Sequence, residues 1–128
     1  MDLIRELLLK LEQLSSAHRV VTFTADDEEI AVEGYTPDEI EYHLALIWRE
    51  GFVETGTSGS GQMMSGEFLF RRLTWKGHDL IDSIRDPEVW KKTKEGASKA
   101  GGWTVQLLAD FSKAILKQKL KEMTGFEL

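Results

Sequence analysis

The segment TPDEIEYHLALIWREG at residues 36–51 carries the signals for both ends of an α-helix. Thr36 is a favoured N-cap residue, Pro37 suits the first helical position, and Glu39 completes a capping box three residues after the cap. Gly51 is a natural C-terminal stop. A strand-like run, FVETG, follows this helix directly, so the chain is predicted to fold as an α+β protein. The predicted buried stripe of the helix follows helical spacing: Ile40, Leu44 and Ile47.

A glycine-rich stretch, TGTSGSGQMMSG at residues 55–66, separates two strand-like segments. The first is FVETG at 52–56. The second is EFLFRRLT at 67–74, which alternates as a strand with one buried face does. The pattern predicts an antiparallel β-hairpin with a long loop at its tip. Upstream, the short runs at 19–24 and 29–33 are separated by acidic residues and predict a second, smaller hairpin.

Further helices are predicted on both sides of these strands. Residues 2–15 repeat apolar positions at helical spacing. Thr74 begins a helix with a buried stripe at Leu80, Ile81 and Ile84. Asp86 and Pro87 are cap and first residue of the next helix. A last helix runs from a cap at Thr104 to about Met123, with a broad apolar face: Val105, Leu108, Phe111, Ile115, Leu116, Leu120 and Met123.

Helix, short strands, helix, β-hairpin and helix is the layout of a winged helix. The segment EIEYHLALIWREGFVE resembles the recognition helix and first wing strand of many winged-helix proteins. With LTWKGHDLIDSIRDPEVWKKTK at 73–94, the chain is similar over residues 1 to about 120 to a bacterial and phage family, domain of unknown function 2513. The resemblance implies a winged-helix-like fold and implies no activity.

The length of 128 residues and the apolar content of 41% suit one domain with a substantial core. We expect a winged-helix-like core over residues 1–86. Residues 87–128 are expected to add two C-terminal helices packed on the same domain.

The charge is unevenly distributed along the chain. Residues 1–66 hold 4 Lys and Arg against 13 Asp and Glu, a net of −9, whereas residues 67–128 hold 12 against 9, a net of +3. This asymmetry shows where a polyanion can approach, and a solvated acidic half with a solvated basic half is its simplest interpretation.

The first functional hypothesis is a DNA-associated regulator of phage or prophage type that contacts double-stranded DNA. The predicted recognition helix is poor material for this, because Asp38 and Glu41 point outward where phosphates would lie. The loop between Glu54 and Glu67 also has no Lys or Arg. Binding is therefore predicted to use basic residues of the returning strand and the later helices: Arg71, Arg72, Lys76, Lys113, Lys117 and Lys121.

The alternative hypothesis is a protein-interaction module whose wing fold binds a host or phage protein instead of DNA. It would use the outward face of the acidic helix and an adaptable methionine surface. The residues predicted to contact the partner are Glu41, Tyr42, Arg49, Met63 and Met64.

An enzyme is not expected. The three histidines show no HExxH or similar ligand spacing, and the serines lie in no GxSxG motif. His78, Asp79 and Asp82 fall within one turn, but two or three such residues on a helix are more often structural than metal ligands. No metal and no cofactor is therefore predicted.

The chain is expected to be cytoplasmic, because it has no cysteine and its start resembles neither a signal peptide nor a membrane span. The four tryptophans are expected to serve mostly as packing residues, with Trp48, Trp90 or Trp103 as interface anchors if they are partly exposed. By analogy with winged-helix regulators, a homodimer through the C-terminal helices is expected.

Overall fold

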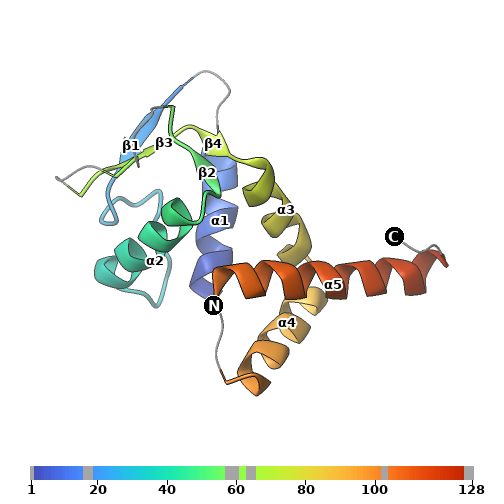
Figure 1. Cartoon of the computed structure of the whole chain (residues 1–128). Helices are drawn as coiled ribbons and strands as arrows, with labels where there is room; N and C mark the ends of the chain where they lie inside the picture. Colours follow the sequence, from blue (N-terminus) through green and yellow to red (C-terminus); the bar gives the residue numbers. More distant parts are fainter. Residues whose placement is uncertain (1, 16–18, 57–60, 63–65, 102–103, 126–128) are drawn as a thin grey trace. The chain divides into compact units, whose positions relative to one another are not determined.

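The computed structural model describes residues 2–15, 19–56, 61–62, 66–101 and 104–125. It is of the α+β class, as predicted, with helices and short strand pairs (Figure 1). The chain divides into two compact units, Met1–His78 and Asp79–Leu128. The division falls within helix α3 (Trp75–Ile84). The two units are described in turn.

Helix α1 (Asp2–Leu14) supplies much of the core of the first unit. Its apolar stripe packs against helix α2 (Pro37–Arg49) and strand β4 (Arg72–Leu73). The buried residues follow the predicted helical period: Leu3, Ile4, Leu7, Leu8 and Leu11.

Helix α2 begins and ends as the sequence predicts. The backbone N–H of Glu39 donates to Thr36 Oγ1 at 3.2 Å, and the Thr36 N–H donates to Glu39 Oε1 at 3.1 Å, which completes the capping box. Gly51 has φ of 76°, a left-handed conformation that favours glycine. The predicted stripe is confirmed, because Ile40, Leu44 and Ile47 are all buried.

The strands form two antiparallel pairs. Strand β2 (Val53–Glu54) pairs with β4, with Val53 opposite Leu73 and Glu54 opposite Arg72. Strand β3 (Phe68–Phe70) pairs instead with β1 (Val21–Phe23), with Val21 opposite Phe70. The hairpin predicted from residues 52–74 is therefore confirmed at its base. Further up, Gln62 bridges Phe68 and the Leu69 N–H donates to Gly61 O at 2.7 Å, while β3 also pairs with the N-terminal strand β1.

The small hairpin predicted from residues 19–24 and 29–33 is wrong. Its first segment pairs with β3, and residues 24–31 form turns, in which the N–H groups of Ile30 and Ala31 both donate to Asp27 O at 3.1 Å. The Asp27 carboxylate also accepts the Thr24 N–H at 3.0 Å. Aspartate favours such local turns, and Ile30 is fully buried between exposed neighbours rather than in a strand.

An aromatic cluster joins the strands to α2. The Trp48 indole donates from Nε1 to Leu69 O at 3.0 Å and meets Phe23 and Phe68 edge-on, with ring centroids 5.9 and 5.0 Å away. A Cβ at Gly61 would lie 2.2 Å from Thr55 Cγ2 and 3.0 Å from Trp48 Nε1. Glycine is therefore required at position 61 for the chain to pass this close to the cluster.

The second unit contains two long helices packed against each other, α4 (Pro87–Lys99) and α5 (Val105–Thr124) (Figure 1). Both begin at the predicted caps, Asp86 and Thr104. The helices approach closely at Gly96, where an added Cβ would lie 2.0 Å from the Phe111 ring. The predicted stripe of α3 is also buried, at Leu80, Ile81 and Ile84.

Candidate interaction surface on helix α2

The outward face of α2 is the first candidate surface. Positions 38, 41, 42, 45 and 49 share this face because they recur at helical spacing. Asp38, Glu41, Tyr42 and Arg49 are exposed, and Ala45 is half-buried. The exposed face thus opens with two carboxylates and carries its cation, Arg49, only in the last turn.

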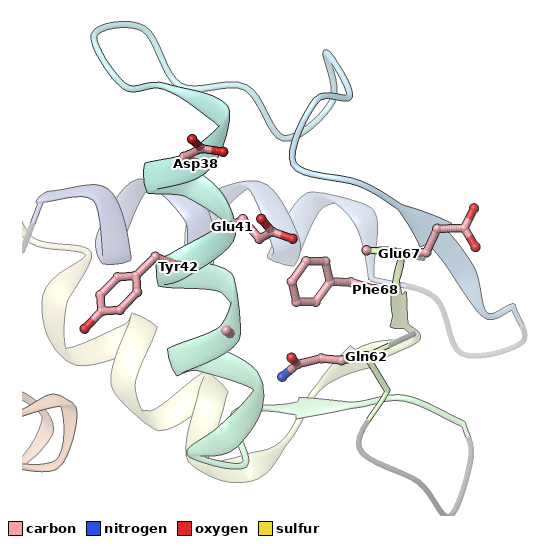
Figure 2. Close-up of a pocket in the computed structure, with 8 residues that line it drawn as sticks. Asp38, Glu41, Tyr42, Gln62, Glu67 and Phe68 are labelled. Atoms are coloured by element: carbon pink, nitrogen blue, oxygen red, sulfur yellow. The ribbon is translucent and has the colours of Figure 1, made fainter. Parts of the chain in front are cut away.

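A groove runs between this face and strand β3. Its volume is about 340 Å³, at the small end of the range for ligand sites. Phe68 forms its floor, and Glu41 extends from α2 toward the Phe68 ring, whereas Tyr42 points to the other side of the helix (Figure 2). The groove is lined by Asp38, Glu41, Tyr42, Ala45, Gln62, Gly66, Glu67 and Phe68.

A smaller hollow of about 150 Å³ continues the groove at the start of α2. It shares Asp38, Glu41 and Gly66 with the groove and adds Asp26 from the turn before α2. Glu41 reaches across the groove, since a Cβ added at Gly66 would lie 3.8 Å from its Oε1. Among the described residues that line the two hollows there is no lysine or arginine.

The other residues predicted from the sequence to contact a partner are Tyr42, Arg49, Met63 and Met64. Tyr42 is 64% exposed and meets the His43 ring edge-on with centroids 5.4 Å apart. Met63 and Met64 lie outside the described residues. Glu41 is therefore the predicted contact that the structure directs into the groove, whereas Tyr42 borders the groove and points to the other side of α2, and Arg49 lies at the end of the same face.

Two of the predicted basic side chains of the first unit, Arg72 and Lys76, contact neighbouring acids or carbonyl groups. Arg72 forms an ion pair with Glu54, the residue opposite it in the β2–β4 pair. Lys76 donates to the carbonyl oxygen of Glu50 at 2.8 Å and lies 3.9 Å from the Glu50 carboxylate. Arg71 is half-buried, and its backbone N–H donates to Glu54 O at 2.9 Å.

The predicted basic residues of the second unit lie along α5. Lys113 donates to Asp79 Oδ2 at 2.8 Å, and this hydrogen bond raises the pKa of the lysine above its ordinary value of 10.5. Lys117 and Lys121 are exposed. The structure thus places this lysine row on one helix, as the spacing predicts.

An ion-pair cluster that the sequence does not reveal joins the start of α4 to α5. Lys119 Nζ lies 2.6 Å from Asp86 Oδ2 and 3.4 Å from Glu88 Oε2. The hydrogen bond from Lys119 lowers the pKa of Asp86, and the same bond raises the pKa of Lys119. Hydrogen bonds from Lys92 and then Lys119 lower the pKa of Glu88. These ion pairs link the two helices, and the charges of Asp86, Glu88 and Lys119 are balanced by one another rather than directed at a ligand.

Trp75 is an exposed residue that the sequence interpretation missed. It is 93% exposed at the first position of α3, whereas Trp48 and Trp90 are buried. The signal was available, because position 75 lies half a helical turn away from the buried Ile84 on a helical wheel. Trp103, another predicted anchor, lies outside the described residues.

A metal centre finds no support among the residues that the structure describes, where no group of three potential ligands is close enough to hold an ion. The acids beside His78 are engaged elsewhere. Asp79 accepts from Lys113, and Asp82 accepts from Arg85 at 3.2 Å.

The chain belongs to the DUF2513 family, described as a hypothetical protein, whose family model matches residues 1–103. It is also 32% identical over 123 residues to a Haemophilus influenzae protein described as an uncharacterized protein, covering 93% of this chain and 95% of that one. No solved structure matches the chain. Along the described part of the chain, no helix is both long and apolar enough to cross a membrane.

Proposed function

We propose that this chain is a non-enzymatic, winged-helix-like module that binds a cationic segment of another protein along helix α2. The observation that carries the proposal is the groove between α2 and β3, where Asp38 and Glu41 stand beside an apolar floor at Phe68. A side chain with an apolar stem and a positive head suits such a groove, because it buries the stem and pairs the head.

The winged-helix part of the proposal is supported by the order of elements. Helix α1, strand β1, helix α2, the β2–β4 pair and helix α3 follow one another as in a winged helix. The turns at residues 24–35 stand where the middle helix of a three-helix core would lie. The helix that would read a DNA groove is then α2.

Charge placement favours a protein partner over a duplex on this face. A duplex presents closely spaced phosphates, and binding depends on neutralising several of them with Lys or Arg. The start of α2 instead brings Asp38 and Glu41 forward, with Asp26 beside them. Of the cations predicted to bind DNA, Arg72, Lys76 and Lys113 already pair with acids of the same unit.

A DNA-associated role is the second candidate, and the exposed lysines of α5 favour it. Lys117 and Lys121 lie one turn apart on the same side of the helix. In this case Arg71→Glu combined with Lys117→Glu lowers affinity for a duplex and flattens its salt dependence. Glu41→Lys leaves duplex binding unchanged or strengthens it.

The proposed function is tested with a fluorescent synthetic helix of lysine and leucine, arranged so that one face is apolar and the other cationic. Its binding to the full chain is followed by fluorescence anisotropy. Glu41→Lys replaces an attraction with a repulsion at the groove. It is expected to weaken binding by up to about tenfold, since an exposed ion pair contributes roughly 0.2–1 kcal/mol and a repulsion of similar size takes its place.

The matched control is Glu33→Lys, which makes the same change in net charge at an exposed acid outside the groove. The control is expected to change the peptide's Kd by less than about twofold, because isolated surface charges are largely screened. Equal weakening by both substitutions would show that the peptide responds only to the net charge of −6, and the proposal would fail.

A further inference from the structure

We propose that the segment held by the α2 groove is the C-terminal end of helix α5 from a second copy of this chain. This inference rests on the proposed function and names the partner. The two packed helices of the second unit have unequal lengths, so α5 has turns that α4 is too short to match. Helix α5 has 20 residues and α4 has 13, and Lys119 of α5 already lies beside Asp86 and Glu88 at the start of α4.

The last turns of α5 extend past the start of α4 (Figure 1). From Lys113 to the end of the helix no residue is fully buried, although its first two turns bury Val105 and Leu108. Met123 is 71% exposed. This end of α5 is helical and only partly covered within its own unit.

This partly covered end combines apolar and cationic side chains, which is the combination that suits the groove. Lys117, Leu120 and Lys121 lie within about one turn on one side of α5. Lys117 is exposed and makes no ion pair with another described residue. With Leu120 over Phe68, the two lysines would lie close enough to the apolar contact to reach the acids of α2 beside it.

The spacing of the charges also matches. Lys117 and Lys121 are four residues apart, a rise of about 6 Å along a helix, and Asp38 and Glu41 are three apart, a rise of about 4.5 Å. Lysine side chains are long and flexible enough to absorb the difference. The two lysines can therefore reach the two carboxylates at the same time.

Other lysines of the second unit are less suited to this contact. Lys92 lies 3.3 Å from Glu88 in an i,i+4 pair, and Lys94 Nζ lies over the Trp90 ring, 5.9 Å from its centroid. Lys113 is held by Asp79. The distal end of α5 is thus the described cationic segment of this chain that best complements the acidic half, which carries a net of −9 over residues 1–66.

Sedimentation velocity of the full chain tests the inference, with protein concentration and salt varied. The wild type is expected to exceed the mass of one 14.6 kDa chain as concentration rises, and to dissociate at high salt, because added ions screen exposed pairs. Glu41→Lys and Lys117→Glu are each expected to weaken association about tenfold, as an exposed pair turned into a repulsion does.

The decisive variant combines Glu41→Lys with Lys117→Glu. It exchanges the two charges, so the pair between copies is restored and association is expected to return toward the wild-type level. Lys91→Glu is the control, because Lys91 is an exposed lysine of α4 outside the proposed contact. Circular dichroism of each variant shows that it is folded.

Recovery of association in the double variant, with Lys91→Glu unchanged from wild type, supports the inference. A chain that stays monomeric at low salt overturns it, and so does self-association that neither single substitution weakens. In both of those cases the proposed function would still be supported if Glu41→Lys, and not its control Glu33→Lys, weakened binding of the lysine–leucine peptide.

Discussion

Gly77→Ala tests how tightly the start of α3 is joined to the start of β2. A Cβ at position 77 would lie 2.2 Å from the carbonyl oxygen of Phe52 and 3.3 Å from Leu73 Cβ. Because Cβ contacts below 3.0 Å essentially do not occur, the helix start or the strand must move by at least about 0.8 Å.

The groups around this contact resist such a movement. Phe52 is fully buried, and its carbonyl oxygen accepts the Thr74 N–H at 3.0 Å. Thr74 Oγ1 donates to Gly51 O at 2.7 Å and accepts the Gly77 N–H at 3.1 Å. A shift of the helix start therefore strains three hydrogen bonds together, each contributing about 0.5–1.5 kcal/mol.

Opposing effects decide the magnitude. Replacing glycine by alanine in a helix stabilises it by at most about 1 kcal/mol, whereas overpacking costs about 1–3 kcal/mol before the strained bonds are counted. We expect Gly77→Ala to lower the free energy of unfolding by about 1–3 kcal/mol, measured by urea unfolding followed by circular dichroism.

Gly96→Ala is the matched control. Its Cβ would also clash, 2.0 Å from the Phe111 ring, but that ring is 41% exposed and can turn outward. Its stability is expected to stay within about 1 kcal/mol of wild type, since helix propensity offsets lost packing. A Gly77→Ala variant as stable as wild type, or more so, would refute the close approach of α3 to Phe52.

Two further predictions concern buried and paired groups. Trp75→Ala should change the free energy of unfolding by less than about 0.5 kcal/mol, because Trp75 is 93% exposed. Trp48→Ala should lower the free energy of unfolding by about 3–5 kcal/mol, because Trp48 is buried. A loss above about 1 kcal/mol in Trp75→Ala would contradict the exposure of this side chain. The pKa of Asp86 is lowered from 3.8, so the stability that its pairing with Lys119 contributes is lost as the pH falls below 3.8. The pKa of Lys119 is raised from 10.5, so the same contribution is lost as the pH rises above 10.5. Between these values the pair stabilises the fold. Lys119→Met should therefore flatten the acid decline of the unfolding midpoint, and an unchanged profile would argue against the pair.

Features set by neighbouring residues in the chain could be predicted from the sequence. The caps at Thr36, Asp86 and Thr104 depend on contacts between residues two to three positions apart, and all three form. The buried stripes of α1, α2 and α3 follow from helical spacing alone. The alternating pattern likewise placed β2 and β4 correctly at the base of the hairpin.

Features that depend on distant partners could not be predicted. Val21 pairs with Phe70, and no local pattern distinguishes this pairing from the expected one with residues 29–33. The outward acids of α2 followed from periodicity, but the apolar floor at Phe68 required β3 to be placed beside the helix. The ion pair between Arg72 and Glu54 could have been predicted, because the register of the hairpin sets these residues opposite each other.

The central claim is that the face of α2 serves a protein partner rather than DNA. The most direct measurement titrates a fluorescent random-sequence duplex and the lysine–leucine peptide in parallel, at about 50 and about 200 mM salt, over roughly 10⁻⁶ to 10⁻⁴ M. We expect the peptide to bind and Glu41→Lys to weaken it, with no binding of the duplex at either salt concentration. Two results together would contradict the claim. The duplex would bind in a salt-sensitive way that Arg71→Glu combined with Lys117→Glu abolishes, and Glu41→Lys would leave binding of the peptide unchanged.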